Sequence, residues 1–218
     1  EIGDRSEFLL SKKKLENPGK QMANLVIKLS NFCETLGSPC IIGIPCNTFH
    51  VELIFNKFKD TIYKSIKIKK NKPGFINILN MIDLTVIYLK KKKIKNVGLM
   101  STTGTRNFNL YKNKLNKEKI NLIEVSLKNQ PILHNLIYCK KTGIKTLSYA
   151  TTKVRNKFIQ FIKYLKKNGS EAIILGCTEI PIAIPEKKLF DLEMIDPIVM
   201  LSREMIKLSN KKKLSDCK

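Results

Sequence analysis

The feature that most constrains the fold is a pattern that occurs twice: an amphipathic helix, a glycine, an apolar strand, and a cysteine followed by small polar residues. The first copy ends at residues 40–48 (CIIGIPCNT), and the second ends at residues 171–179 (EAIILGCTE). Short apolar runs bounded by turns are typical of parallel strands covered on both faces. Such sheets bind ligands at the carboxyl ends of their strands. The pattern therefore predicts that Cys46 and Cys177 lie at strand ends, where chemistry is usually done.

The helices before the two cysteines have the same design. Apolar residues recur at helical spacing over 22–36 and again over 154–165, and Gly37 and Gly169 follow as helix stops. The repeat predicts an α/β fold of two similar subdomains with parallel sheets, related by a pseudo-twofold axis, with the two cysteines facing each other across a cleft. The alternative is that two α/β units each end a core strand in a buried cysteine, a residue type that is often buried.

Strand and helix patterns alternate along the rest of the chain. We expect a first α/β subdomain at 1–94 that lacks its N-terminal strand, a second at 95–190, and a C-terminal helix and tail at 191–218 that returns to the first. The expected helices cover 20–36, about 49–58, 83–92, a segment ending near 117, 129–141, the surroundings of Val154, and a last segment starting at Pro197. The expected strands cover 39–45, 75–81, 96–100, 121–126 and the run before Cys177.

Composition narrows the class of protein. The 218 residues are 43% hydrophobic, which suffices for a substantial core, and no apolar run approaches the length of a membrane span. Nothing at the start has the pattern of a signal peptide, so we expect a soluble, cytoplasmic protein. Six cysteines without a Cys-x-x-Cys pair, with only two histidines, suit neither a disulfide framework nor a zinc site. Free thiols and no metal are therefore expected.

The formal charge of +23 has two interpretations. An excess of this size can attract nucleic acid or anionic surfaces without specificity. Nearly all of it is lysine, however, scattered over every expected helix and loop among abundant isoleucine and asparagine, which is typical of a bias towards A/T-rich codons. No helix-turn-helix, zinc finger or aromatic stacking platform accompanies the charge. We expect no specific nucleic-acid partner and no membrane partner.

Residues 45–50 (PCNTFH) and 175–181 (LGCTEIP) together resemble the paired signature of the aspartate/glutamate racemase superfamily. Glutamate racemases usually have histidine after the second Cys-Thr, so Glu179 points to the aspartate racemase branch. The similarity extends over nearly the whole chain. Supporting matches in the family's order are Asp4-Arg5-Ser6, Asn80-Met81-Ile82, Thr102-Thr103-Gly104-Thr105 and Ile195-Asp196-Pro197.

The resemblance implies an isomerase that racemises aspartate or glutamate without pyridoxal phosphate, metal or other cofactor, and that is usually a homodimer. Cys46 and Cys177 would lie on opposite faces of the substrate's α-carbon. One thiolate removes the α-proton while the opposing thiol donates a proton from the other side. A thiol of ordinary pKa near 8.5 must be partly ionised for this chemistry, which a helix N-terminus or a nearby cation promotes.

Recognition of an acidic substrate needs a cation and several hydrogen-bond donors. By resemblance, Arg5 would make a bidentate contact to the distal carboxylate. Lys141 would add a point charge, and Lys145 is the alternative. The candidates for donors to the α-carboxylate as it becomes enediolate-like are Asn47, Thr48 and Thr178.

Further candidates have roles that the sequence leaves open. Thr102 and Thr105 either line the cleft or cap the next helix, and Glu179 is counted among the substrate-binding residues. His50 is expected to be a structural histidine, and Asp196 an N-cap. Two other functions remain alternatives: a catalytically silent, basic binding protein on a racemase scaffold, or another superfamily isomerase of the hydantoin racemase or maleate isomerase type.

Overall fold

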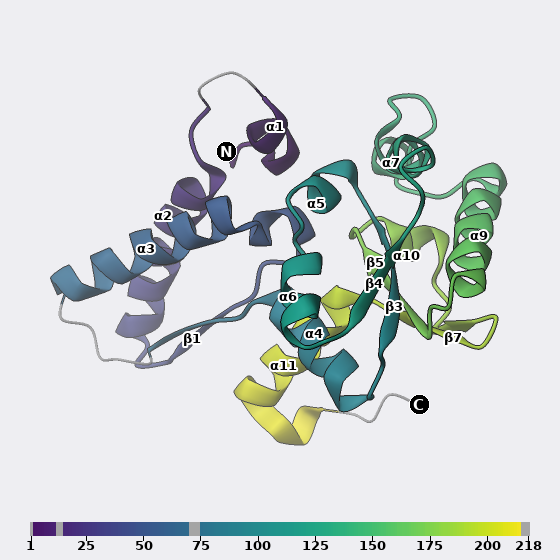
Figure 1. Cartoon of the computed structure of the whole chain (residues 1–218). Coiled ribbons are helices and arrows are strands. Elements are labelled where there is room, and N and C mark those ends of the chain that lie inside the picture. Colours follow the sequence, from purple (N-terminus) through teal and green to yellow (C-terminus); the bar gives the residue numbers. More distant parts are fainter. Residues whose placement is uncertain (1, 12–14, 70–74, 215–218) are drawn as a thin grey trace. The chain divides into compact units, whose positions relative to one another are not determined.

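The computed structural model describes residues 2–11, 15–69 and 75–214 (Figure 1). Packing divides the chain into two compact units: unit 1 comprises Glu1–Met81 and Leu201–Lys218, and unit 2 comprises Ile82–Met200. These divisions fall between 81 and 82 and between 200 and 201, whereas the sequence analysis placed them between 94 and 95 and between 190 and 191. The segment after 81 packs in unit 2, where the Tyr88 hydroxyl donates to the Glu193 carboxylate.

Unit 1 has two long helices beside a small parallel sheet. The central residues of its sheet are apolar, and Cys40, Ile42 and Ile44 are buried in its core. Strand β1 pairs with β2 in parallel, from Cys40 opposite Ile76 to Ile42 opposite Ile78. Its elements are α1 (Arg5–Leu10), α2 (Pro18–Thr35), β1 (Cys40–Ile42), η1 (Asn47–His50), α3 (Glu52–Lys69), β2 (Ile76–Ile78), the second part of α11 (Pro197–Asn210) and η2 (Lys211–Lys213).

Unit 2 is built on a five-stranded sheet in the order β4-β3-β5-β7-β6, parallel except for the β6–β7 pair. The α/β fold with parallel sheets is therefore confirmed. Its strands are β3 (Asn96–Ser101), β4 (Asn121–Glu124), β5 (Ala172–Gly176), β6 (Lys188–Leu189) and β7 (Leu192–Ile195). Its helices are α4 (Met81–Lys91), α5 (Thr103–Asn107), α6 (Lys112–Lys117), α7 (Gln130–Tyr138), α8 (Ile144–Leu147), α9 (Thr152–Lys167), α10 (Ile180–Ala183) and the start of α11.

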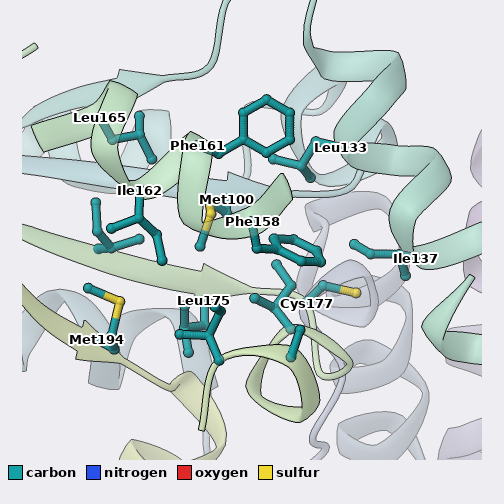
Figure 2. Close-up of a cluster of buried hydrophobic side chains, with 14 of the residues drawn as sticks. Met100, Leu133, Ile137, Phe158, Phe161, Ile162, Leu165, Leu175, Cys177 and Met194 are labelled. Atoms are coloured by element: carbon teal, nitrogen blue, oxygen red, sulfur yellow. The ribbon is translucent and has the colours of Figure 1, made fainter. Parts of the chain in front are cut away.

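The core of unit 2 lies between helices α7 and α9 and strands β3, β5 and β7. The apolar face predicted for 154–165 is buried throughout, and its members are Val154, Phe158, Phe161, Ile162 and Leu165. They pack against Met100 and Leu175 in one cluster, which extends to Cys177 at the end of β5 (Figure 2). Packing within this cluster therefore fixes the position of Cys177.

The apolar face expected on α2, the counterpart of α9 in the first copy of the pattern, is only partly buried. Val26 and Ala23 are buried, but Leu25, Leu29, Phe32 and Leu36 are 48–63% exposed. Helical spacing indicates which side chains share a face, but it does not say what covers that face. Gly37 and Gly169 adopt positive φ angles of 63° and 92° after the helices, as the helix-stop interpretation requires.

Several elements differ from the expectation. The strand expected at 75–81 covers only Ile76–Ile78, and the helix expected at about 49–58 covers Glu52–Lys69. The strand at 39–45 is confined to 40–42, and Pro45, which has no N–H for a sheet ladder, lies beyond its end. The helix ending near 117 is interrupted, and Asn109 has a positive φ of 50° between α5 and α6. The hairpin of β6 and β7 was not predicted.

Cys217 and the other residues of the tail at 215–218 fall outside the described residues. Cys33, Cys40, Cys46, Cys139 and Cys177 are free thiols. Within the part of the chain that the structure describes, no helix is both long enough and apolar enough to cross a membrane.

Candidate active site

Three neighbouring parallel strands of unit 2 end at the same edge of the sheet. Ser101, the last residue of β3, is the register partner of Gly176, the last residue of β5, so Thr102 and Cys177 come next along the two strands. Ile174 of β5 is likewise paired with Ile195 of β7, which Asp196 follows. The register therefore brings the Thr102 turn, Cys177 and Asp196 to one edge, at the strand ends where Cys177 and the Thr102 turn were predicted.

Cys177 is buried, with 8% of its surface exposed, and its thiol has a carboxylate partner. The Sγ–H donates to Glu179 Oε2 at 2.8 Å, and the Thr178 hydroxyl donates to the same oxygen at 2.9 Å. A carboxylate in direct contact with a thiol can accept its proton and so generate the nucleophilic thiolate. The turn after β5 thus contains a thiol and an adjacent proton acceptor.

The turn after β3 is formed by two buried threonines. Thr102 Oγ1 accepts from the Thr105 N–H at 3.4 Å and lies 3.3 Å from Thr105 Oγ1. Thr102 is therefore the N-cap of α5, which confirms the capping interpretation. Lining of a substrate cleft by these two hydroxyls stays a prediction.

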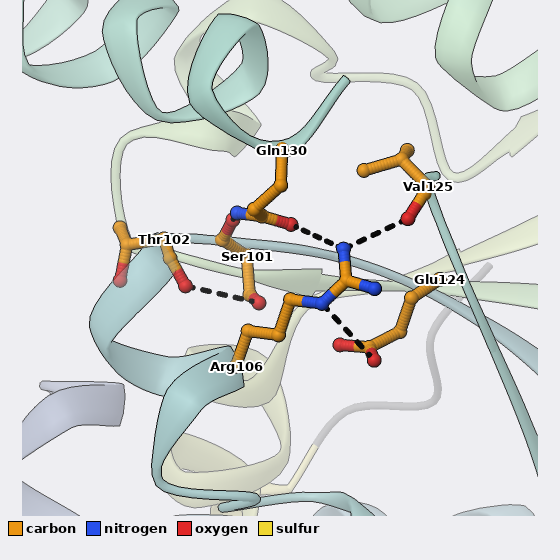
Figure 3. A network of polar contacts seen from close by, with 6 residues as sticks. All are labelled: Ser101, Thr102, Arg106, Glu124, Val125 and Gln130. Atoms are coloured by element: carbon orange, nitrogen blue, oxygen red, sulfur yellow. Dashed lines mark hydrogen bonds and ion pairs between the residues drawn. The ribbon is translucent and has the colours of Figure 1, made fainter. Parts of the chain in front are cut away.

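An arginine network, which the sequence analysis did not identify, holds the neighbouring strand ends (Figure 3). Arg106 of α5 donates to the Val125 carbonyl and to Gln130 Oε1, and it is ion-paired with Glu124 at 3.4 Å. Gln130 in turn donates to the Ser101 carbonyl. The sequence signal was the rarity of arginine, which occurs only four times in the chain.

Two ionisable groups beside Cys177 have shifted pKa values. Burial raises the pKa of the Tyr111 phenol well above its ordinary value, and the negative charges of Asp196 and Cys177 raise it further, against a hydrogen bond from Thr85. Burial also raises the pKa of Asp196, although the Ile198 N–H donates to its carboxylate at 2.8 Å. That bond confirms Asp196 as an N-cap. Tyr111 was not predicted, because a buried aromatic in a helical pattern has no distinguishing signal.

In unit 1, Cys46 lies between β1 and the short helix η1, at the N-cap position of η1. Cys46 is half-buried, and its carbonyl accepts from the Phe49 N–H at 3.2 Å, while Asn47 and Thr48 are buried. His50 is 1% exposed, and its Nε2–H donates to the Ile44 carbonyl at 3.0 Å, with its ring 4.8 Å from that of Phe55. His50 therefore has the structural role that was expected.

The predicted cations lie in separate elements. Arg5 is the first residue of α1, a helix that Asp4 caps by accepting from the Glu7 N–H. Lys141 is exposed in the loop after α7, and its backbone N–H donates to the sulfur of Cys139. Lys145 lies over the Tyr138 ring, 4.5 Å from its centroid, and donates to the Tyr138 hydroxyl at 3.3 Å.

Each unit therefore collects part of the predicted site. Unit 1 contains Arg5, Cys46, Asn47 and Thr48, and unit 2 contains Thr102, Thr105, Lys141, Cys177, Thr178 and Glu179. Within the described residues, no group of three or more His, Cys, Asp or Glu side chains is arranged to hold a metal ion.

Parallel sheets with thiols and small polar turns after their strands define an α/β fold of the type found in aspartate and glutamate racemases. The profile of the Asp/Glu/Hydantoin racemase family matches residues 68–205, more than half of the chain, so the chain belongs to this family of racemases, which are isomerases. The supporting structural similarities extend over most of the chain.

Among solved structures, the chain is similar to an aspartate racemase from Picrophilus torridus, at 29% identity and a TM-score of 0.68, covering 95% of this chain and 75% of that one. A glutamate racemase from Francisella tularensis subsp. tularensis SCHU S4, solved in complex with D-glutamate, shares the fold at 18% identity and a TM-score of 0.63, covering 99% and 68%. An uncharacterized protein from the pnlA 3′ region of Pectobacterium carotovorum subsp. carotovorum is 28% identical over 111 residues, which are 50% of this chain and 69% of that protein.

Proposed function

We propose that this chain is a cofactor-independent racemase of acidic amino acids, with aspartate as the preferred substrate, and that Cys46 and Cys177 exchange the α-proton. The observation that carries the proposal is the Cys177 thiol at the end of β5, bonded to Glu179 in a chain of the racemase family. Glu179 in place of histidine and the similarity to the Picrophilus torridus aspartate racemase favour aspartate.

The chemistry begins with the transfer of the Cys177 proton to Glu179, for which the 2.8 Å contact is suited. The thiolate then removes the α-proton of one enantiomer, and the Cys46 thiol donates a proton to the opposite face, which inverts the centre. The reverse direction exchanges the roles of the two cysteines. After inversion Cys177 is again a thiol, Cys46 is a thiolate, and Glu179 holds the proton that Cys177 released first. Turnover in the reverse direction starts from this state, or Glu179 releases its proton to solvent and Cys46 takes one from solvent, so every proton is accounted for and no electrons are transferred.

The carbanion formed at the α-carbon must be stabilised by donors aimed at its carboxylate. Thr102, Thr105 and Thr178 of unit 2 can supply hydroxyl donors, and Asn47 and Thr48 of unit 1 are assigned the same role. These five side chains are short, so little conformational entropy is lost when they are held in place.

For the distal carboxylate we assign Arg5 as the bidentate partner and Lys141 as the additional charge, with Lys145 as its alternative. The Lys145 ammonium already has a contact on Tyr138, whereas the Lys141 side chain is exposed. A thiol pair that must stay reduced also favours a reducing compartment, and we assign the protein to the cytoplasm.

The testing experiment measures deuterium incorporation at the α-carbon of L- and D-aspartate and L- and D-glutamate in D2O. Wild type, Cys46→Ala, Cys177→Ala and the control Cys139→Ala are compared. The proposal expects exchange and inversion of one acidic amino acid, loss of inversion in the first two variants, and no loss in the control.

A folded wild type that leaves all four amino acids unchanged would overturn the proposal. Hydantoins and maleate are assayed in parallel. Their turnover, without exchange of any of the four amino acids, would identify another isomerase of the family. Salt-sensitive binding to nucleic acid without any turnover would instead support the silent binding protein.

A further inference from the structure

The carboxyl ends of β3 and β4 and the start of α7 are tied together by two side chains (Figure 3). Arg106 Nη1 donates to the Val125 carbonyl at 2.8 Å and to Gln130 Oε1 at 3.1 Å. Its Nε lies 3.4 Å from the Glu124 carboxylate. Gln130 Nε2 donates to the Ser101 carbonyl at 2.9 Å. The Arg106 guanidinium thus connects the end of β4 to the start of α7, and Gln130 connects the start of α7 to the end of β3.

The orientation of the Gln130 amide depends on Arg106. An amide can offer either its oxygen or its nitrogen to a neighbour, but a guanidinium has donors only. Arg106 therefore selects Oε1, and this choice turns Nε2 towards the Ser101 carbonyl. Gln130 and Ser101 are both buried, so a reversed or lost amide would leave a buried carbonyl without this donor.

The Ser101 carbonyl is a sensitive position, because the chain leaves the sheet there. Ser101 is paired with Gly176, and the next residues are Thr102, which caps α5, and Cys177. A displacement of the end of β3 therefore moves the Thr102 turn relative to the thiol on the adjacent strand. The position of the Thr102 turn therefore matters for the reaction. Displacing a group beside the reacting atoms by about 1 Å can lower the rate about a hundredfold.

We infer that Arg106 and Gln130 are positioning residues of the racemase reaction, holding the Thr102 turn in register with Cys177 through the Ser101 carbonyl. Neither residue is assigned to contact the substrate. The inference rests on the proposed function and adds to it two residues that act only through the end of β3.

The test is Gln130→Glu, which retains an acceptor for Arg106 but presents a carboxylate oxygen to the Ser101 carbonyl. The matched control is Glu171→Gln at the amino ends of the same strands. Glu171 accepts from the Lys95 and Asn96 N–H groups and from the Asn96 side chain, at 2.9–3.2 Å. Gln130→Glu replaces an amide beside β3 with a carboxylate, and Glu171→Gln makes the reverse change. Only Gln130→Glu lies at the edge of the sheet where Cys177 follows β5.

In the α-proton exchange assay with the acidic amino acid that wild type turns over, Gln130→Glu is expected to lower kcat about ten- to a hundredfold. The loss should lie in kcat rather than KM, because donors aimed at the enediolate act mainly in the transition state. Glu171→Gln should retain wild-type kcat even if its Tm falls equally. Arg106→Lys should lower kcat in the same way, since a single ammonium nitrogen replaces the planar fork whose Nη1 and Nε make separate contacts, Nη1 with Val125 and Gln130 and Nε with Glu124.

A double-mutant cycle with Thr102→Val separates positioning from a general structural effect. If Gln130 acts through Thr102, Gln130→Glu should lower kcat by a much smaller factor in the Thr102→Val background than in wild type. Additive losses, or equal losses in Gln130→Glu and Glu171→Gln, would overturn the inference while leaving the racemase assignment in place. Absence of exchange in the wild type would overturn both. If Gln130→Glu does not fold, the same cycle is run with Arg106→Lys.

Discussion

At the scale of single residues, the contact between Cys177 and Glu179 gives the most direct prediction. Glu179→Gln replaces a carboxylate that can accept the thiol proton with an amide that cannot, and leaves the shape of the turn unchanged. Loss of a general base typically costs about a hundredfold or more in rate, and we expect a fall of that size in kcat for α-proton exchange. A Glu179→Gln variant with wild-type kcat would show that Glu179 is not the proton acceptor.

Cys139, at the end of α7, gives a second prediction at this scale. Hydrogen bonds from the Thr142 hydroxyl and from the Lys141 and Thr142 N–H groups stabilise its thiolate and lower its pKa to about 7. Alkylation by iodoacetamide follows the thiolate, so its rate at Cys139 should rise with pH through a midpoint near 7. Thr142→Val removes the largest of these stabilising contacts and should move the midpoint to higher pH, measured by mass spectrometry of the alkylated peptide.

The control for Cys139 is Thr146→Val. The Thr146 hydroxyl donates to the Cys139 backbone carbonyl rather than to its sulfur. Its removal should leave the midpoint of alkylation where it is. A midpoint in wild type near the ordinary thiol pKa of about 8.5 would contradict the role assigned to the Lys141–Thr142 turn.

At the scale of elements, the contact of α2 with α3 depends on a glycine. A Cβ added at Gly19 would lie 2.2 Å from the Ile54 carbonyl oxygen and 3.0 Å from the Phe58 nitrogen, both backbone atoms of α3. Gly19→Ala should therefore force the helices apart and destabilise the protein by about 1–3 kcal/mol, measured by urea unfolding. Asn24→Ala, at an exposed position of α2, is the control and should be neutral or stabilising.

The exposed apolar stripe of α2 is a candidate interface for the homodimer that the family resemblance implies, and we propose it as such. Leu25, Leu29, Phe32 and Leu36 are spaced by four, three and four residues, as in the seam of a coiled coil. Charge favours a second copy as the occupant, because α2 has only two lysines and one glutamate, whereas α9 has six basic residues. Two α2 helices can therefore approach without strong repulsion in a chain of net charge +23.

Phe32→Lys should weaken this self-association by at least tenfold in Kd, measured by sedimentation velocity over a range of concentrations, because it places two cations in the seam. Leu127→Lys changes the same property at a 79% exposed position of unit 2 and should leave the dimer intact. A monomeric wild type at high concentration, or equal weakening by both variants, would exclude α2 as the dimer interface.

Elements with strong local patterns were predictable from the sequence, and those defined by remote partners were not. The period of Val154 to Leu165 identified a fully buried face, and Gly37 and Gly169 identified the helix ends. Strand β7 was missed because the turn before it uses Phe190 and Asp191 at φ 51° and 65°, where glycine or asparagine is the usual signal.

The residues of the candidate site were also predictable only where the local sequence defines them. Cys177 and the Thr102 turn could be placed at strand ends from their flanking residues alone. The contacts of Arg106 and Gln130 could not be predicted, because they join residues 19 to 29 positions apart, and two of the three acceptors are backbone carbonyls, which carry no sequence signature. Assignment of Cys46 to the same reaction remains a prediction.

At the scale of the whole molecule, net charge should govern stability. A chain of +23 repels itself when folded, and the range of that repulsion shrinks from roughly 30 Å at 0.01 M salt to roughly 10 Å at 0.1 M. Its Tm should therefore rise with NaCl over this interval, measured by differential scanning calorimetry. Choline chloride at equal ionic strength should act alike, and a Tm that is flat or falls would contradict the role of repulsion.

Gly43, in the N-terminal part of unit 1, packs against a helix from the C-terminal part of the sequence. A Cβ there would lie 2.5 Å from the Met205 sulfur and 3.1 Å from Leu201, so the middle turns of α11 pack directly on the segment that leads to Cys46. Unit 1 is therefore discontinuous in sequence, whereas unit 2 is one continuous stretch. During synthesis on the ribosome, residues 82–200 emerge complete and can fold first, while the core beside Cys46 has to wait for Leu201 and Met205.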